Sequence, residues 1–332
     1  MTSQASDEPG ARVEFASRSD VGQVRSANED SCDSYVRNDG TRLLVVADGM
    51  GGHQGGATAS RTAVATISEI FDQDTSIDLR EMIVRAIRAA NTRVYGMAQA
   101  DSELEGMGTT VVAFMLDARH RAMVAHVGDS RAYRYRVGRI DPLTTDHSVV
   151  AEMHRRGLIS ADEAAVHPRR NEILRSVGVL PEVDVEVTSV EVAAGDSFIL
   201  CSDGLSGVVA DEEIAGIIQS ETPAAAVDRL VDLANERGGP DNITVQVLSI
   251  PADADTGDPE ATAPVELSEV GIQAIENKRA ARLRARRFGL ALLIALAGLG
   301  AYFLFDTLLG ASDANRIEPA AESEAPRRGI PR

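Results

Sequence analysis

The sequence has 332 residues with 33 basic and 51 acidic side chains, a formal net charge of −18 at pH 7, and 44% hydrophobic residues, enough for a sizeable core. This excess of acid argues against broad, sequence-independent binding to nucleic acid, because such binding needs many Lys and Arg side chains. The single lysine, Lys278, excludes a Walker lysine, a Schiff base or a pyridoxal anchor elsewhere in the chain.

Residues 1–11 are polar, so we expect a disordered N-terminus that is neither a signal peptide nor part of a core. Residues 12–250 are expected to form one globular domain. Short apolar or alternating runs predict about nine or more strands, with runs at 12–17, 33–37, 41–49, 108–116, 121–130, 131–137, 184–192, 196–204 and 242–250. Helical spacing predicts helices at 56–71, 77–100, 149–157, 161–166, 212–220 and 223–237.

The order of these elements indicates an α+β domain rather than a strictly parallel sheet. Strand follows strand, helices come in pairs, and the segments 37–41 and 136–139 favour tight hairpin turns. Cys32 and Cys201 lie in apolar or strand-like surroundings. We expect them to be reduced thiols of a cytosolic core rather than a disulfide.

The C-terminal part of the chain changes its charge abruptly. Residues 251–277 carry seven acids, three prolines and no base, which is typical of a solvated linker. Residues 278–287 then carry six positive charges, and the next eighteen residues have none. Eighteen helical residues rise about 27 Å, close to the thickness of a bilayer core. We therefore expect a transmembrane helix over 288–309, with a buried core helix as the alternative.

The basic segment before this predicted helix indicates its orientation. Positive charges next to a membrane span stay on the cytoplasmic side. We therefore expect a single-pass protein of the cell membrane with a cytoplasmic domain, and a short extracytoplasmic tail over 310–332.

Four aspartates stand where predicted core strands begin or end. Asp48 and Asp203 each end an apolar run and precede a glycine, while Asp129 ends a third run and Asp241 opens the last strand. A single Asp-Gly usually marks a turn. Several carboxylates at strand ends of one core can converge, however, and Mg²⁺ and Mn²⁺ prefer oxygen ligands. The absent side chain of Gly49 would also let its carbonyl approach an ion.

A second polar segment places Arg25 four residues before the acidic pair Glu29 and Asp30. An arginine can hold a phosphate through two hydrogen bonds, which is useful beside a metal site that attacks phosphorus. A surface ion pair is the alternative for this segment.

Six short motifs occur in the order residues 25–30 (RSANED), 48–53 (DGMGGH), 108–110 (GTT), 128–131 (GDSR), 201–205 (CSDGL) and 239–244 (GPDNIT). This set resembles that of the metal-dependent PPM, or type 2C, protein serine/threonine phosphatases, over residues 12–250. The resemblance implies a four-layer α-β-β-α sandwich of two antiparallel sheets flanked by helices, with two Mn²⁺ or Mg²⁺ ions at one end. The basic segment, apolar span and outer tail are similar to those of membrane-anchored bacterial members.

The resemblance also implies roles by position. Asp48 would bridge both ions, the carbonyl of Gly49 would be a ligand, and Asp203 and Asp241 would hold one ion. Two further acids would act mainly through bound waters, and one arginine would grip the substrate phosphate. These three residues are Glu29, Asp30 and Arg25.

In bacterial members a weaker third ion is implied at Asp129 together with Asp203. Asn171 lies where a further ligand of this ion is expected. The segment 144–175 corresponds to the flap beside the bacterial site, and its several arginines suit acidic phosphopeptides.

The mechanism implied by two metals is direct. The ions would lower the pKa of a bridging water, and the hydroxide would attack phosphorus in line while Arg25 takes up developing charge. Met50 stands where animal members carry a histidine as the general acid. The proton for the leaving oxygen would therefore come from a metal-bound water or from His53.

These observations predict a membrane-anchored phosphatase of phosphoserine and phosphothreonine proteins that opposes bacterial transmembrane serine/threonine kinases and acts on their substrates. Its catalytic domain is expected to be monomeric and to bind no nucleic acid. One alternative is a catalytically weak adaptor of the same fold that binds phosphoproteins, although no metal-binding aspartate is lost. A nucleotide-binding loop at 51–56 is disfavoured because no lysine follows.

Overall fold

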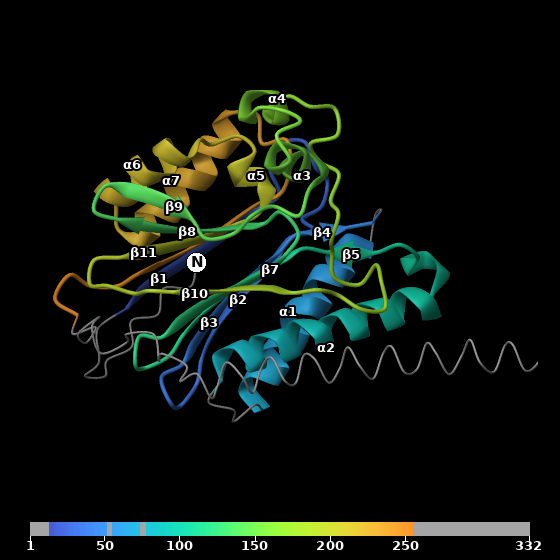
Figure 1. Ribbon diagram of the computed structural model, residues 1–332, viewed down its shortest axis with the longest axis horizontal. Coiled ribbons are helices and arrows are strands. Elements are labelled where there is room, and N and C mark those ends of the chain that lie inside the picture. Colours follow the sequence, from blue (N-terminus) through green and yellow to red (C-terminus); the bar gives the residue numbers. More distant parts are fainter. Residues whose placement is uncertain (1–12, 52–54, 74–77, 255–332) are drawn as a thin grey trace, which may run out of the picture. The chain divides into compact units, whose positions relative to one another are not determined.

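Two antiparallel five-stranded sheets stack face to face, and paired helices cover their outer faces (Figure 1). The computed structural model describes residues 13–51, 55–73 and 78–254, all within one compact unit of the chain. Helices α1 (Gly55–Gln73) and α2 (Leu79–Ala100) cover one sheet, and α6 (Asp211–Ser220) and α7 (Pro223–Glu236) cover the other. The predicted four-layer α-β-β-α sandwich is therefore confirmed.

Strands distant in sequence are neighbours in both sheets. The sheet under α6 and α7 has the order β1 (Glu14–Asp20), β12 (Ile243–Ser249), β11 (Ser197–Cys201), β8 (Arg131–Arg136) and β9 (Arg139–Pro142). The sheet under α1 and α2 has the order β10 (Glu186–Val190), β7 (Ala122–Val127), β6 (Val111–Leu116), β3 (Arg42–Ala47) and β2 (Ser31–Val36). A small two-stranded sheet pairs β4 (Gly49–Met50) with β5 (Gly108–Thr109).

The sandwich explains why central strands such as β3 have continuous apolar sequences. Leu44 and Val46 belong to the core between the two sheets, whereas Leu43 and Val45 belong to the core under α1 and α2. Successive side chains of a strand point to opposite faces, and here both faces are buried. Between the sheets, the rings of Phe114 and Phe198 stack with centroids 4.5 Å apart.

Local signals set the helix boundaries. The side chain of Asp78 accepts hydrogen bonds from the amides of Arg80 and Glu81 and so caps α2. Thr222 caps α7, and Pro223 occupies its first turn. The segment between β9 and β10 carries two short helices, α3 (Val149–Arg155) and α4 (Ala161–Ala165), and corresponds to the predicted flap.

All nine predicted strands and six predicted helices are present, with shifted ends. Three predictions ran too far, because the strands predicted at 41–49, 121–130 and 196–204 end at Ala47, Val127 and Cys201. In each case the chain leaves the sheet before its aspartate. The short helix α5 (Asp203–Ser206) and the strand β9 were not predicted. The hairpin turn predicted at 136–139 does connect β8 to β9.

Several predictions lie outside the described residues. They concern 1–11, His53, the linker beyond residue 254, the basic segment 278–287, the apolar segment 288–309 and the tail 310–332. Among residues 13–51, 55–73 and 78–254, no helix has both the length and the apolar character needed to cross a membrane. Cys32 and Cys201 are both free thiols, as expected.

Candidate metal centre

Antiparallel pairing brings five aspartates to one end of the sandwich. Ser31 at the start of β2 pairs with Ala47 at the end of β3, so the residues just outside these two positions are neighbours. Cys201 at the end of β11 likewise pairs with Val245 near the start of β12. The aspartates that lie within two residues of these and neighbouring strand ends are Asp30, Asp48, Asp129, Asp203 and Asp241.

Four of these carboxylates are crowded together and largely shielded from water, whereas the side chain of Asp241 is 30% exposed. Burial raises the pKa of Asp30 to about 7, with Asp203 and Asp241 adding repulsion. Burial also raises the pKa of Asp129 to about 7, again with repulsion from Asp203. The pKa of Asp48 lies well above its usual range because of burial and then the charges of Asp30 and Asp203. Asp30, Asp48 and Asp129 therefore share one electrostatic environment that disfavours their negative charges.

Two oxygens in this cluster fit a cation. Oδ1 of Asp30 and Oδ1 of Asp203 are buried and have no hydrogen-bond partner among the described residues. A buried polar atom without a partner is costly, and hard divalent cations take carboxylate oxygens as ligands. The donor set and its repulsion therefore match a site for Mn²⁺ or Mg²⁺.

The other oxygen of Asp30 is held by two hydroxyls that the sequence analysis did not single out. Ser202 Oγ and Thr244 Oγ1 donate to Asp30 Oδ2 over 2.8 and 2.7 Å. These bonds favour the charged form of Asp30, so they oppose the effect of burial. Only Oδ1 of Asp30 is then left for a cation, and the two bonds fix the direction in which it points.

The backbone of Asp48 is fixed by the segment after β5. Thr110 donates its amide to the carbonyl of Asp48 over 2.8 Å and accepts the amide of Asp48 on its own Oγ1 over 3.0 Å. Thr109 Oγ1 also donates to the Asp48 carbonyl. The hydroxyl of Thr110 lies 2.7 Å from that of Ser130, the residue after Asp129. Thus one threonine contacts the segments that carry two of the predicted ligands.

Gly49 lies in a close contact of three backbone segments. A Cβ at this position would collide with the carbonyl oxygens of Gly56 and Glu29. The absence of a side chain is therefore required for β4, α1 and the segment before β2 to meet. Glu29 itself is placed by its amide, which donates to Asn242 Oδ1 over 2.8 Å. Whether the Gly49 carbonyl and Glu29 bind metal stays a prediction.

Arg25 lies at the edge of this cluster, with its side chain half-exposed. Its Nη2 is 2.7 Å from Asp241 Oδ2, and neither Glu29 nor Asp30 is its ion-pair partner. The segment is tied down by Asn242, whose Nδ2 donates to the carbonyls of Val21 and Ala27. Arg25 thus stands at the mouth of the carboxylate cluster.

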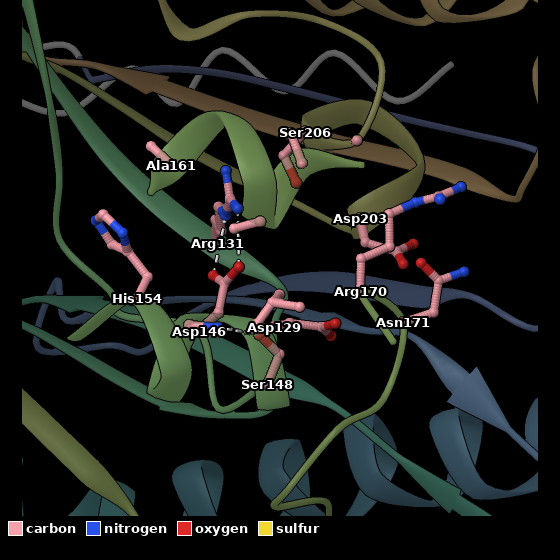
Figure 2. A pocket seen from close by; sticks show the side chains of 15 residues that line it. Asp129, Arg131, Asp146, Ser148, His154, Ala161, Arg170, Asn171, Asp203 and Ser206 are labelled. Carbon is pink, nitrogen blue, oxygen red and sulfur yellow. Dashed lines mark hydrogen bonds and ion pairs between the residues drawn. The ribbon is translucent and has the colours of Figure 1, made fainter. Parts of the chain in front are cut away.

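A pocket of about 450 Å³ joins this cluster to the flap. Its lining includes Asp129, Asp203 and Asn171, so the predicted third-ion residues do share one cavity. Figure 2 shows Asp203 and Asn171 on one side and a paired Arg131 and Asp146 on the other. The two hydrogen bonds from Arg131 to Asp146, at 2.9 and 2.8 Å, were not anticipated from the sequence. No sequence signal distinguished Asp146 from other surface acids.

The two predicted proton donors for the leaving group are a metal-bound water and His53. Met50 lies in β4 and is partly exposed, so an apolar side chain does occupy the position after the Asp-Gly pair. His53 lies outside the described residues. The source of the proton for the leaving group therefore stays open between the two predicted donors.

The four-layer fold and its terminal carboxylate cluster define a domain built around a metal centre. The family model described as protein phosphatase 2C matches residues 22–249. The chain therefore belongs to the protein phosphatase 2C family, which confirms the resemblance inferred from the six motifs.

Relatives with assigned activities extend over the same region. The serine/threonine protein phosphatase PstP of Mycobacterium tuberculosis is 40% identical over 238 residues, which are 72% of this chain and 45% of PstP. This chain therefore matches about half the length of that relative. The serine/threonine phosphatase stp of Listeria welshimeri is 37% identical over 236 residues, 70% of this chain and 93% of that protein.

A solved structure shows metal in a similar domain. The crystal structure of the PstP catalytic domain in complex with two manganese ions has a TM-score of 0.65 and 38% identity, and the match covers 72% of this chain and 98% of that one. The two ions in this relative agree with the predicted two-ion centre.

Proposed function

We propose that this protein is a metal-dependent phosphatase that removes phosphate from phosphoserine and phosphothreonine in proteins. The observation that carries the proposal is the convergence of five aspartates at one end of the sandwich, with buried carboxylate oxygens that lack a partner. Family membership and the named activities of the relatives support it.

Individual residues would have the following roles. Two divalent cations, when bound, supply positive charge that activates water and stabilises charge developing on phosphorus. Asp48 would contact both ions, and Asp203 and Asp241 would hold one of them. The remaining predicted ligands are the carbonyl of Gly49, the carboxylates of Asp30 and Glu29, and, for a weaker third ion, Asp129.

Substrate would enter beside Arg25. This guanidinium is half-exposed and can turn from Asp241 to a phosphate without leaving the surface. It can offer two parallel hydrogen bonds, which match the geometry of a phosphate. The flap pocket next to Asp129 and Asn171 would then accommodate residues flanking the phosphorylated one.

A direct test uses the full chain in detergent and a phosphothreonine peptide. Turnover should require Mn²⁺ or Mg²⁺ and should be abolished in Asp48→Asn and in Asp203→Asn. Asp72→Asn, an exposed aspartate of α1 away from the site, is the matched control and should keep wild-type turnover. Metal-independent turnover would contradict the proposal, and phosphopeptide binding without turnover would favour the adaptor alternative.

We also propose that the protein is anchored in the cell membrane with the catalytic domain in the cytoplasm. The support is the sequence alone, namely six positive charges in 278–287 followed by the apolar segment 288–309. The full chain should sediment with membranes, and a chain ending at residue 277 should not. Protease added outside intact cells should spare the domain, and digestion of the domain would overturn this topology.

The physiological opponents would be bacterial serine/threonine kinases of the same membrane and their substrates. A membrane-held phosphatase meets membrane-held substrates at high local concentration, which supports this assignment. Accumulation of phosphothreonine in membrane fractions of cells lacking the protein would be the expected result.

A further inference from the structure

Two histidines and a glutamate form a second cluster that contains none of the five aspartates. His126 on β7, His147 before α3 and Glu186 on β10 each offer one ligand atom, and these atoms lie within 4.8 Å of one another. Both histidines are buried, and their rings stack with centroids 4.5 Å apart and planes 15° apart. Imidazole and carboxylate ligands of this kind are typical of Zn²⁺ sites.

The hydrogen bonds of His147 argue against a metal. Its Nδ1 accepts the amide proton of Gly128 over 3.1 Å, so Nδ1 carries no proton. A neutral imidazole then has its proton on Nε2, which lies 3.2 Å from Glu186 Oε2. An ion on Nε2 would move that proton to Nδ1, where it would face the Gly128 amide. Arg175 Nη1 is 3.5 Å from Nε2 and is the more distant neighbour.

The hydrogen bond of the second histidine also argues against a metal. His126 Nε2 lies 2.9 Å from the carbonyl of Thr145, which can only accept, so this nitrogen carries a proton. In addition, an imidazole lone pair lies in the plane of its ring. Two nearly parallel stacked rings therefore do not direct their lone pairs at one common point. The three residues are better explained as side chains that hold neighbouring segments of the chain in place.

His147 joins three segments of the chain. Its amide donates to the carbonyl of Gly128 over 3.0 Å, so both its backbone and its ring are bonded to Gly128. Its carbonyl accepts the amide of Leu174 over 2.7 Å, at the returning end of the flap. Gly128 directly precedes Asp129, the predicted ligand of the third ion. His147 therefore connects both ends of the flap to the segment that carries Asp129.

We propose that His147 is a positioning residue whose neutral ring, with the proton held on Nε2 by Glu186, couples the flap to Asp129. The inference rests on the proposed function, because Asp129 is a predicted metal ligand. Burial and the neighbouring His126 lower the pKa of His147, which is consistent with a neutral ring. Movement of the flap would thus be transmitted to the segment of Asp129 through one residue, with the ring of His147 adding a second bond to Gly128 beside the backbone one.

Two substitutions of His147 test the roles of its two ring nitrogens separately. In His147→Asn the side-chain oxygen takes the place of Nδ1 and can still accept from Gly128. In His147→Gln the amide reaches only the place of Nε2, so the Gly128 amide loses its acceptor. Loss of a buried acceptor costs on the order of 1–3 kcal/mol, so amide exchange at Gly128 should accelerate about fivefold to a hundredfold in the Gln variant only.

The same two variants are compared by calorimetry of Mn²⁺ binding to the full chain. The weakest Mn²⁺ equilibrium should weaken about fivefold or more in His147→Gln and stay near wild type in His147→Asn. Equal behaviour of the two variants in both measurements would overturn the proposal. Because exchange at Gly128 is measured without turnover, it stays informative even if the protein proves inactive on phosphopeptides.

The wild-type chain gives a test that does not depend on variant folding. Ring-nitrogen NMR should show His147 as the neutral Nε2–H form, unchanged when Zn²⁺ is added to the metal-loaded protein. Glu186→Gln keeps an oxygen that accepts from Nε2 but removes a metal-binding carboxylate, so it should leave Gly128 exchange unchanged. Stoichiometric Zn²⁺ binding that perturbs His126 and His147 and is lost in Glu186→Gln would establish a metal site and overturn the proposal.

Discussion

Arg25 forms an ion pair with Asp241, with Nη2 and Oδ2 2.7 Å apart. The residue predicted to hold the substrate phosphate is therefore paired with a residue predicted to hold a metal. A cation bound at Asp241 would compete for this carboxylate and release the guanidinium for a phosphate. If both predicted roles hold, the ion pair would link occupation of the metal centre to readiness for substrate.

Replacing Arg25 by alanine should raise KM for a phosphothreonine peptide about ten- to a hundredfold, because one charge-assisted contact is worth about 1.5–3 kcal/mol. Arg25→Lys should be intermediate, since lysine keeps the charge but not the paired hydrogen bonds. Steady-state kinetics under saturating Mn²⁺ would measure this. The similarly exposed Arg93, paired with Glu69, is the matched control and should tolerate alanine without a change in KM.

Replacing Asp203 by asparagine should stabilise the metal-free protein while removing metal-dependent stabilisation. Asp203 repels Asp241 and Asp129, and the substitution removes that charge. A gain of 1 kcal/mol corresponds to a rise of about 2–4 °C in Tm for a domain of this size. Thermal unfolding with chelator and with Mn²⁺ would show it. A metal-free Tm below that of wild type would contradict the assigned repulsion.

The stability of the metal-free protein should depend on pH through Asp30. Its pKa is raised from 3.8 to about 7 by burial, so the folded state binds more protons than the unfolded state between these values. The stabilisation from its protonated form is complete below about pH 4 and is lost as pH rises to about 7. Each pKa unit corresponds to about 1.4 kcal/mol. Denaturant unfolding of wild type and Asp30→Asn from pH 4.5 to 8 should show a steeper decline in wild type, and saturating Mn²⁺ should reduce that difference.

Substituting alanine for Gly49 should disrupt the centre, because the added Cβ would meet the backbone carbonyls of Gly56 and Glu29. Forcing extra volume into a packed contact costs about 1–3 kcal/mol. We expect a lower Tm and weaker Mn²⁺ binding by calorimetry. Gly96 in α2 has open space around it, so Gly96→Ala should instead stabilise by about 0.5–1 kcal/mol. Equal effects at both positions would contradict the packing argument.

The sequence was most informative where apolar patterns and short motifs coincide. The runs that contain Leu43 to Ala47 and Phe198 to Cys201 predicted buried strands, and the strands are there. The aspartates that follow these runs, Asp48 and Asp203, are predicted metal ligands. The same patterns misjudged where three strands end, because the predicted ranges included the Ser, Asp and Gly residues that follow the last residue of each strand.

The groups that hold the predicted metal ligands in place were not accessible from the sequence. Ser202 and Thr244 bind Asp30 across 172 and 214 residues of chain. The pairing of Arg131 with Asp146 and of His147 with Gly128 depends on how the flap returns to the sheet. Serine, threonine and histidine in these positions have no periodic signal, since their partners lie on other strands.

The sequence by itself determined the order of the elements, the family and the identity of the acidic residues at strand ends. These properties follow from local periodicity and from motifs contained within a few residues. Only the tertiary structure decided which carboxylate oxygens lack a partner, that Arg25 pairs with Asp241, and that His147 joins the flap to Asp129. Such contacts depend on the register and stacking of two sheets, and that arrangement is fixed by packing of the whole domain rather than by any one segment.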